Sequence, residues 1–347
     1  MTRLLTGLVT LVALVAGAVA VHAQNVERKD VKISLDWAFQ GPQSIFLYGL
    51  ERGRFQKEGL NVTIDRGSGS ADTITRVASG AYDFGWADIA TMTKFNAQNP
   101  DKELLAVYIT GDNSPLAIVT VEGRGIKTPK DLEGKKLGAT AGSAALALFD
   151  AFAEKAGIDP KKITWQQISG QLREPMMVRG DLDAVAGFTT SSIMSVVDLG
   201  VPLQKVVVLR YNDFGVKQYG TAIFARPDFV KTNPMTVAAV VRAVNNALKD
   251  AIADPKASVK TILARDPLVN LDTECIRLFD GLETLTLTQH FRTEGLSSVD
   301  NARMKSSIDE TLTAFQIKAD VPIEKVFTAA FLPPKAERIP PQPGSCK

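Results

Sequence analysis

Short apolar runs alternate with longer amphipathic segments along the first two thirds of the chain. In the first run, Val31, Ile33 and Leu35 alternate with polar residues, which is the period of a half-buried strand. Similar strands are predicted at residues 62–64, 84–86, 104–109, 116–121, 136–139, 163–167, 184–187, 206–209 and 221–225. Helical segments separate most of these strands, and this alternation predicts an α/β fold with mostly parallel sheets.

The second half of this pattern repeats the first. The polar segment Thr110–Pro115 predicts a break between two domains. Residues 67–70 and 140–143 are Gly/Ser-containing loops that each lead into a helix. Long helical segments follow Tyr219, and we expect them to pack back on the first domain. The Pro-rich residues 333–347 are expected to form a loose surface tail.

The N-terminus has the pattern of an export signal. Arg3 supplies a positive start, residues 4–21 are almost entirely apolar, and Val21-His22-Ala23 fits a cleavage site. A membrane anchor of similar length is the alternative. We expect cleavage after Ala23, without lipid attachment, because no cysteine stands there. The remainder has no second long apolar run, so we expect no stable membrane insertion after the signal is removed.

The charge balance argues against nucleic acid as a partner. The chain carries 40 Lys and Arg residues against 38 Asp and Glu residues, for a formal net charge of +2. Loss of Arg3 with residues 1–23 lowers this charge by one, and no run of five or six like charges occurs. A strongly basic nucleic-acid-binding surface is therefore not expected.

Groups for hydrolytic or metal-dependent chemistry are scarce. The histidines are His22 and His290, and neither lies near a serine or cysteine that could complete a triad. No zinc, calcium, Walker or dinucleotide pattern occurs, so no metal or cofactor is expected. Cys275 and Cys346 could form a disulfide in an oxidising compartment, or could be two unrelated thiols.

Polar and aromatic residues gather at the ends of predicted strands, where open α/β sheets bind ligands. The loops at residues 67–70 and 140–143 would offer backbone N–H groups and hydroxyls to a ligand if the two halves form a cleft. Ordinary helix capping is the alternative for each loop. Trp37, Phe39, Trp86 and Phe188 could stack on a ligand or pack in the core. Asp36, Asp88 and Asp213 could accept ligand N–H groups or cap helices, and capping is favoured for Asp88.

Three segments of the chain resemble a known family. They are Leu35-Asp36-Trp37, residues 53–62 (Gly-Arg-Phe-Gln-Lys-Glu-Gly-Leu-Asn-Val) and residues 79–85 (Ser-Gly-Ala-Tyr-Asp-Phe-Gly). They are similar to the periplasmic substrate-binding proteins of ABC importers that bind thiamine pyrimidine precursors, alkanesulfonates, taurine or nitrate, a group with an NMT1/THI5-like domain. Residues 213–216 (Asp-Phe-Gly-Val) with Tyr219-Gly220 resemble the thiamine-precursor branch. The resemblance covers about residues 30–325.

This resemblance implies a type II periplasmic binding fold: two lobes, each a mostly parallel sheet flanked by helices, joined by a two-strand hinge. Residues 30–112 and 214–332 would form lobe 1, and residues 113–213 would form lobe 2. A monomer would capture a small molecule in the periplasm and deliver it to an ABC permease. The expected ligand-facing residues are Asp36, Trp37, Phe39, Gln43, Ser68, Ser70, Trp86, Asp88, Gly142, Ser143 and Phe188.

One departure from the family concerns the ligand. Thiamine-precursor proteins usually carry Pro-Asn and a histidine after the Asp-Trp pair, whereas residues 38–44 here read Ala-Phe-Gln-Gly-Pro-Gln-Ser. A thiamine pyrimidine precursor is the first expectation, and other aromatic, heteroaromatic or anionic solutes stay open. A sulfonate would need arginine donors, and Arg66, Arg173 and Arg210 are candidates that we expect at the surface.

Two further functions were weighed on the same scaffold. The fold also hosts a desulfinase and a eukaryotic pyrimidine synthase, and either activity would need a cysteine or histidine in the cleft. The sequence places neither at a strand end, so we expect that the chain is not an enzyme. A sensory ectodomain would need a transmembrane segment after the lobes, and we do not expect one in the polar tail.

Overall fold

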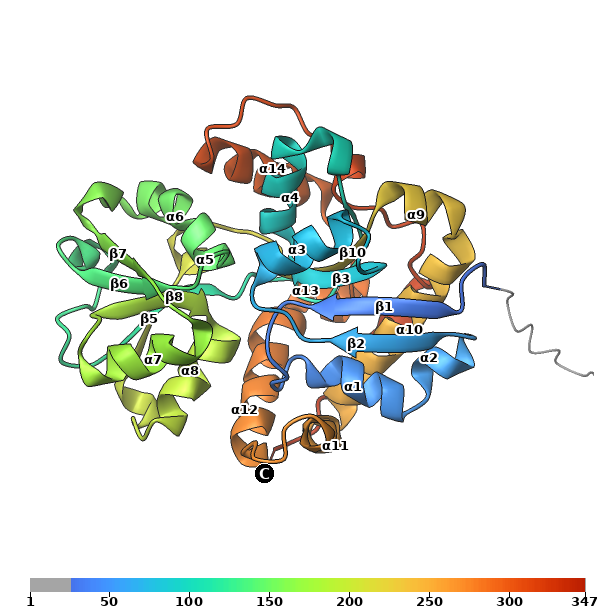
Figure 1. The fold of residues 1–347 in the computed structure, drawn as a ribbon, viewed down its shortest axis with the longest axis horizontal. Coiled ribbons are helices and arrows are strands. Elements are labelled where there is room, and N and C mark those ends of the chain that lie inside the picture. Colours follow the sequence, from blue (N-terminus) through green and yellow to red (C-terminus); the bar gives the residue numbers. More distant parts are fainter. Residues whose placement is uncertain (1–25, 347) are drawn as a thin grey trace, which may run out of the picture.

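The computed structural model describes residues 26–346, which form two α/β lobes side by side (Figure 1). The predicted signal peptide, residues 1–23, lies outside the described residues. No helix within residues 26–346 is both long and apolar enough to cross a membrane. Each lobe is built on one five-stranded sheet, and the predicted two-lobed α/β fold is thereby confirmed.

Lobe 1 contains the sheet with strand order β2-β1-β3-β10-β4. Strand β1 runs parallel to β2 and β3, and β10 runs antiparallel to β3 and β4. All residues of β3 and β10 are buried, because helices cover both faces of the sheet (Figure 1). The strands are β1 (Asp30–Leu35), β2 (Asn61–Asp65), β3 (Phe84–Asp88), β4 (Leu105–Ile109) and β10 (Thr221–Ala225).

The helices of lobe 1 come from both ends of the chain. Helices α3, α4 and α14 lie on one side of the sheet, and α1, α2 and α10 lie on the other (Figure 1). Their bounds are α1 (Ser44–Glu51), α2 (Arg54–Lys57), α3 (Ser70–Ala78), α4 (Ile89–Gln98), α9 (Pro227–Thr232), α10 (Pro234–Ala253), α11 (Pro255–Lys260), α12 (Leu271–Gly281), α13 (Gln289–Glu294), α14 (Asn301–Ala314) and α15 (Lys335–Arg338). Among the late helices, α10 packs on α1 and α14 packs on α4.

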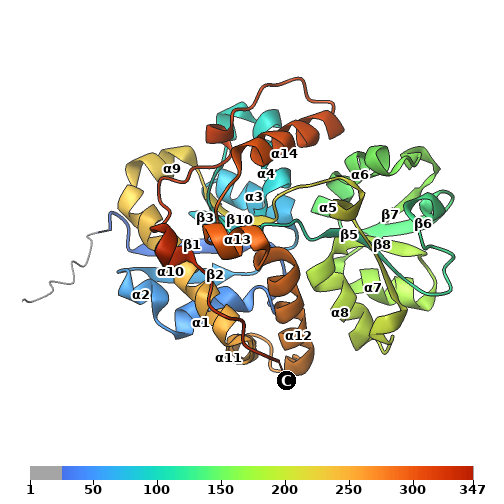
Figure 2. The same ribbon diagram turned by 180° about the vertical axis from the view of Figure 1, so that it is seen from behind.

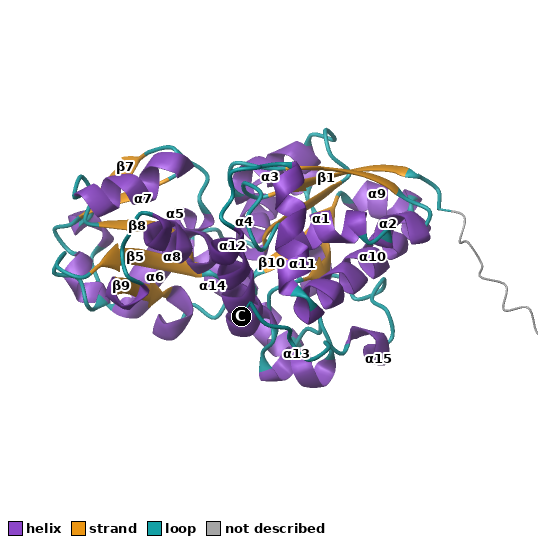
Figure 3. Ribbon diagram, turned by 90° about the horizontal axis from the view of Figure 1, so that it is seen from below, coloured by secondary structure: helices purple, strands orange, loops and turns teal. Residues whose placement is uncertain are grey.

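Lobe 2 contains the sheet with strand order β7-β6-β8-β5-β9. Strand β6 runs parallel to β7 and β8, and β5 runs antiparallel to β8 and β9. The elements are β5 (Leu116–Val121), β6 (Lys136–Ala139), β7 (Thr164–Gln167), β8 (Ala184–Phe188) and β9 (Val206–Arg210), with α5 (Ala144–Ala147), α6 (Phe149–Ala156), α7 (Gly170–Arg179) and α8 (Thr189–Asp198). Figure 3 shows the two sheets in separate lobes, each surrounded by helices.

The two sheets share one topology, which confirms that the second half repeats the first. In both, a central strand pairs in parallel on one side and antiparallel on the other, so β1, β2 and β3 correspond to β6, β7 and β8. The turn before the third strand is also repeated. Asp83 accepts a hydrogen bond from the backbone N–H of Lys32 at 2.9 Å, and Asp183 accepts one from Lys136 at 2.8 Å. Corresponding strand ends can therefore be compared directly.

The chain crosses between the lobes twice, once after β4 and once after β9 (Figure 2). The two crossings are held together at the lobe 1 end. The backbone N–H of Gly220 donates to the carbonyl of Gly111 at 2.9 Å, and the hydroxyls of Thr110 and Thr221 lie 2.9 Å apart. These contacts join the two segments that connect the lobes into a single hinge.

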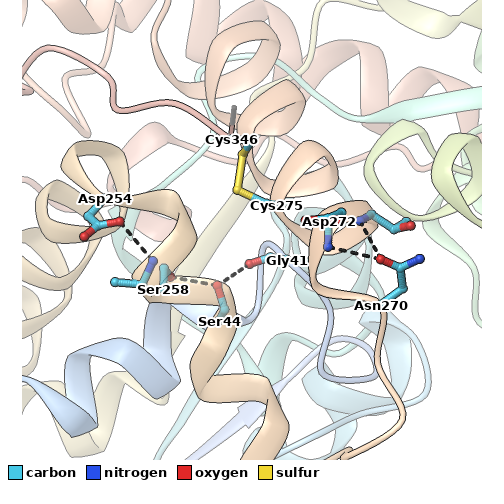
Figure 4. Close-up of a disulfide and its surroundings, with 10 residues drawn as sticks. Gly41, Ser44, Asp254, Ser258, Asn270, Asp272, Cys275 and Cys346 are labelled. Carbon is cyan, nitrogen blue, oxygen red and sulfur yellow. Dashed lines mark hydrogen bonds between the residues drawn. A yellow bond between two sulfur atoms is a disulfide. The ribbon is translucent and has the colours of Figure 1, made fainter.

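The C-terminal segment is tied to lobe 1 instead of being loose. Cys346 forms a disulfide with Cys275 of α12, so the pairing left open by the sequence is present (Figure 4). The N–H of Gly344 also donates to the carbonyl of Ile252 at 2.8 Å, and the carbonyl of Glu337 accepts from two side chains of α10. The expectation of a loose tail was wrong because proline-rich composition does not reveal such anchoring contacts.

Candidate functional site

A small cavity of about 40 Å³ lies between the lobes, where the strand ends of both sheets meet. Six of the eleven expected ligand-facing residues line it. They are Asp36, Trp37, Gln43 and Ser70 from lobe 1, and Ser143 and Phe188 from lobe 2. We call this space the ligand cavity. It continues outward into a wider vestibule of about 550 Å³, and a third space of about 50 Å³ lies on its hinge side.

The other five expected residues lie outside the ligand cavity. Ser68 is exposed at the vestibule and donates to Asp72. Trp86 faces the hinge-side space, where its indole N–H donates to Thr110 at 2.8 Å. Phe39 packs on the lobe 1 core with Arg265 5.5 Å from its ring centroid. Asp88 caps α4 by accepting from the N–H of Thr91 at 2.7 Å, as the favoured alternative predicted, and Gly142 contacts the opposite lobe.

The Gly/Ser loops meet across the cleft, although they do not occupy corresponding places in the two lobes. A Cβ atom placed on Gly69 would lie 3.4 Å from the carbonyl oxygen of Gly142. The loop at residues 67–70 follows β2, whereas the loop at residues 140–143 follows β6, which corresponds to β1. The predicted repeat of the two halves is therefore confirmed. The prediction that these two loops occupy equivalent positions in the halves was wrong.

Trp37 of lobe 1 makes a second contact with lobe 2. It follows β1 and lies against Gly170 at the start of α7, where a Cβ would come within 2.5 Å of Cη2 of the indole. The guanidinium carbon of Arg173 lies 5.6 Å from the Trp37 ring centroid. Trp37 borders both the ligand cavity and the vestibule. It therefore lies at the boundary between the inner space and the outer space.

Hydrogen-bond acceptors without partners line the ligand cavity. Gln43 is 5% exposed, and its amide N–H donates to Asp36 at 3.1 Å while its Oε1 has no partner. Thr140 is 6% exposed, and its hydroxyl oxygen also has no partner. Buried polar atoms normally find partners, so unpaired ones at a cavity wall are suited to a ligand that supplies N–H or O–H donors.

Two buried carboxyl groups lie on the lobe 1 side, Asp36 in the cavity wall and Asp88 behind it. Burial raises the pKa of Asp36 to about 7, the hydrogen bond from Gln43 opposes this shift, and the charge of Asp88 adds to it. Burial likewise raises the pKa of Asp88 to about 6, against the hydrogen bonds from Thr91. Both carboxyls therefore change charge near neutral pH, and Asp36 does so at the cavity wall.

Arg173 is buried, which corrects the expectation that it lies at the surface. It is 3% exposed and lines the ligand cavity from α7. Its Nη2 and Nε donate to Oε1 of Glu174 at 2.6 and 2.9 Å, and other bonds reach the carbonyl of Ala186 and the hydroxyl of Ser192. The charge of this guanidinium is therefore balanced inside lobe 2 before any ligand enters.

Three further lining residues were candidates from the sequence: Gly69 and Thr140 lie in the two predicted loops, and Arg173 was considered as a sulfonate donor. The lining residues that were not predicted are Gln40, Pro42, Ala144, Gly187, Thr190 and Ser191. The strand-end rule could have found Thr190 and Ser191, because they follow β8. Within residues 26–346, no group of three or more His, Cys, Asp or Glu side chains could hold a metal ion.

A family model described as NMT1/THI5 like matches residues 42–258. The chain belongs to this family. Two curated relatives of the NMT1/THI5-like chain are both named 4-amino-5-hydroxymethyl-2-methylpyrimidine phosphate synthase. The one from Schizosaccharomyces pombe is 26% identical over 60% of this chain and 62% of its own length. The one from Uromyces fabae is 23% identical over 69% of this chain and 72% of its own length.

These relatives overturn the expectation that the chain is not an enzyme, since both are named as a synthase. That expectation rested on the lack of a cysteine or histidine at the strand ends, which is a weak ground for a family whose named members include enzymes. Among solved structures, the alkanesulfonate-binding protein SsuA of Xanthomonas axonopodis pv. citri aligns with a TM-score of 0.68 at 16% identity. The alignment covers 87% of this chain and 99% of that protein, and it shows that the fold is that of periplasmic binding proteins.

Proposed function

We propose that this NMT1/THI5-like chain binds a small planar molecule of the aminopyrimidine class in the ligand cavity. The charge of the cavity wall carries the proposal. Among the described residues that line it, Asp36 and Arg173 are the ones with ionisable side chains, and Glu174 already neutralises Arg173. An anion such as a sulfonate or nitrate would meet no unbalanced positive charge there. A neutral or cationic ring meets a carboxyl group instead.

The polar groups of the wall support the same ligand class. Unpaired Gln43 Oε1, the hydroxyl of Thr140 and the carboxyl of Asp36 would accept N–H groups such as those of an exocyclic amine. Protonated Asp36 could also donate to a ring nitrogen, and its pKa of about 7 makes both forms accessible near neutral pH. Trp37 and Phe188, from opposite lobes, supply apolar ring surfaces.

Two roles fit this ligand class. The fold of periplasmic binding proteins and the predicted export signal support capture of the ligand and its delivery to a membrane permease of the ABC type. The names of the curated relatives support a second role, the synthesis of a pyrimidine phosphate. For that role, Asp36 and Asp88 are the buried groups that could take up or release a proton near neutral pH.

A thermal-shift screen of the purified mature chain tests the ligand class. The compounds are 4-amino-5-hydroxymethyl-2-methylpyrimidine, its phosphate, an alkanesulfonate, taurine and nitrate. We expect a concentration-dependent rise in Tm with the free pyrimidine, because a ligand that binds only the folded state stabilises it. A rise with the sulfonate or nitrate, and none with either pyrimidine, would overturn the proposal.

A growth assay separates the two roles. The strain is a bacterium that cannot make this pyrimidine and lacks its own uptake system for it. Rescue without added pyrimidine by the chain expressed in the cytoplasm without residues 1–23 would support synthesis. Rescue at low added pyrimidine, with dependence on the export signal and a co-expressed permease, would support capture.

A further inference from the structure

Helix α12 of lobe 1 lies against helix α8 of lobe 2 at the seam between the lobes (Figure 1). An ion pair on α12 is buried in this seam. Arg277 is 1% exposed and Glu274 is 5% exposed, and Nε of the arginine donates to both carboxylate oxygens at 3.0 and 3.1 Å. A buried pair of this kind is costly unless all its polar atoms find partners, so its further contacts define its role.

The guanidinium of Arg277 reaches into lobe 2. Its Nη1 donates to the carbonyl of Thr190 at 3.0 Å and to the carbonyl of Ser191. Its Nη2 lies 3.7 Å from Asp198 at the other end of α8, and Thr273 of α12 donates to the same carboxylate at 2.7 Å. Thr190 and Ser191 line the ligand cavity, so Arg277 is fixed to the lobe 2 wall of the site.

The carboxylate of Glu274 holds the lobe 1 wall. Its Oε2 accepts the backbone N–H of Gly41 at 2.5 Å, inside the segment where Gln40, Pro42 and Gln43 line the cavity. A Cβ at Gly41 would clash with the backbone of α12, so the segment lies directly on the helix. One ion pair thus joins the cavity-lining segment of lobe 1 to the cavity-lining start of α8 in lobe 2.

We propose that Glu274 and Arg277 form a latch that holds the two lobes closed over the ligand and keeps both cavity walls in register. They are positioning residues, since neither lines the ligand cavity. This inference rests on the proposed function for its effect on affinity, and on the described contacts alone for its effect on lobe closure. Opening the lobes would break the bonds of Arg277 to α8 and leave its charge paired with Glu274 on lobe 1.

The variant Arg277→Lys tests the latch. Lysine keeps the charge beside Glu274, but its single ammonium group cannot reach two carbonyls of lobe 2 and the carboxylate together. The matched control is Arg54→Lys, because Arg54 makes a two-bond ion pair with Asp250 at 2.6 Å wholly within lobe 1. The measurements are the radius of gyration by X-ray scattering and the dissociation rate of 4-amino-5-hydroxymethyl-2-methylpyrimidine.

The latch predicts a larger radius of gyration for Arg277→Lys than for the wild type, with and without the pyrimidine, and at least tenfold faster dissociation. Arg54→Lys should match the wild type in both. Equal radii for Arg277→Lys and the wild type would overturn the latch whether or not the pyrimidine binds. If the pyrimidine binds to no variant, the proposed ligand class fails while the radii still decide the latch.

A second variant covers the case in which Arg277→Lys does not fold. Asp198→Asn alters the lobe 2 end of the same contact at a side chain that is 39% exposed, so folding should be preserved. It removes the charge that faces Arg277 and weakens the bond from Thr273. About threefold faster dissociation and an intermediate radius of gyration are expected, and wild-type values for both would contradict the latch.

Discussion

Asp36 follows β1 of lobe 1, and Thr140 follows the corresponding strand β6 of lobe 2. The next pair of strand ends differs in the same way, because β3 ends at Asp88 and β8 ends at Phe188. Asp88 caps its helix, whereas Phe188 provides no cap and faces the cavity. One topology thus carries two carboxyls in lobe 1 and a hydroxyl with an aromatic ring in lobe 2.

This difference shows how two lobes with the same topology can form an asymmetric site. The shared features, such as the bonds of Asp83 and Asp183, maintain the sheets, while the strand ends that face each other are free to diverge. Lobe 1 supplies the carboxyl of Asp36, the amide of Gln43 and Trp37, and lobe 2 supplies the hydroxyl of Thr140 and Phe188. A planar ligand with N–H groups and an apolar face uses both kinds of wall.

The largest expected effect concerns the disulfide between Cys275 and Cys346, which lies in lobe 1 and has no counterpart in lobe 2. The variant Cys346→Ser removes a disulfide that spans 71 residues of sequence, and should lower the free energy of unfolding by about 4 kcal/mol in the chain-entropy account. Urea unfolding measures the loss. Hydrogen exchange should quicken in α12 and α10 and stay unchanged in β6 and β8, and faster exchange in lobe 2 alone would contradict the assignment of the disulfide's effect to lobe 1.

The next effect concerns the pH dependence of stability, which we expect from the strand end of lobe 1 that carries Asp36 and not from the corresponding strand end of lobe 2. The pKa of Asp36 is raised to about 7, above its value in the unfolded chain, so its stabilising protonated form is fully present below about pH 4 and is lost as the pH rises through 7. Asp36→Asn should therefore gain about 4 kcal/mol of stability relative to the wild type between pH 4 and pH 8. Thr140→Val, at the corresponding strand end, keeps Asp36, so its difference in stability from the wild type should be the same at both pH values in urea unfolding.

A third effect tests Trp37 as the aromatic wall. Trp37→Ala should weaken binding of 4-amino-5-hydroxymethyl-2-methylpyrimidine at least tenfold, on the order of 1.4 kcal/mol, as measured by calorimetric titration. Phe39→Ala is the control, because Phe39 lies two residues further on but packs on the lobe 1 core outside the cavity. Equal losses in the two variants would mean that the effect of Trp37 is one of packing.

The smallest effect concerns the neutral wall of lobe 2. Thr140→Val should weaken binding of the same pyrimidine about threefold, because the cavity wall loses one hydrogen-bond acceptor for the ligand's N–H groups. It should also raise the free energy of unfolding by about 1 kcal/mol, since the hydroxyl oxygen is buried without a partner. Weaker binding with higher stability would mark Thr140 as a group kept for the ligand. A loss of both binding affinity and stability would indicate that Thr140 has a structural role.

Much of the fold was predictable from the sequence because its strands are short apolar runs bounded by Gly, Pro and Ser residues, as at Val31–Leu35 and Phe84–Trp86. The rule that ligands lie at strand ends found Asp36, Trp37 and Phe188. It could not tell a capping carboxylate from a ligand-facing one, as Asp88 shows. That choice depends on side-chain direction, which hydrophobic periodicity does not encode.

The parts that the sequence did not reveal are contacts between distant segments. Gly41 and Glu274 are 233 residues apart, and nothing in the local pattern of either predicts that they meet. The neutralisation of Arg173 by the adjacent Glu174 depends on both side chains being buried, and the helix that carries them has little amphipathic character. The pairing of Trp37 with Gly170 depends on how the two lobes face each other.

The measurement that tests the central claim most directly is a calorimetric titration of the mature chain with 4-amino-5-hydroxymethyl-2-methylpyrimidine, repeated on Asp36→Ala. The account predicts saturable binding of one molecule per chain to the wild type, and at least tenfold weaker binding to the variant, because the ring loses its carboxyl partner. Equal binding to both proteins, or binding of an alkanesulfonate in place of the pyrimidine, would contradict it.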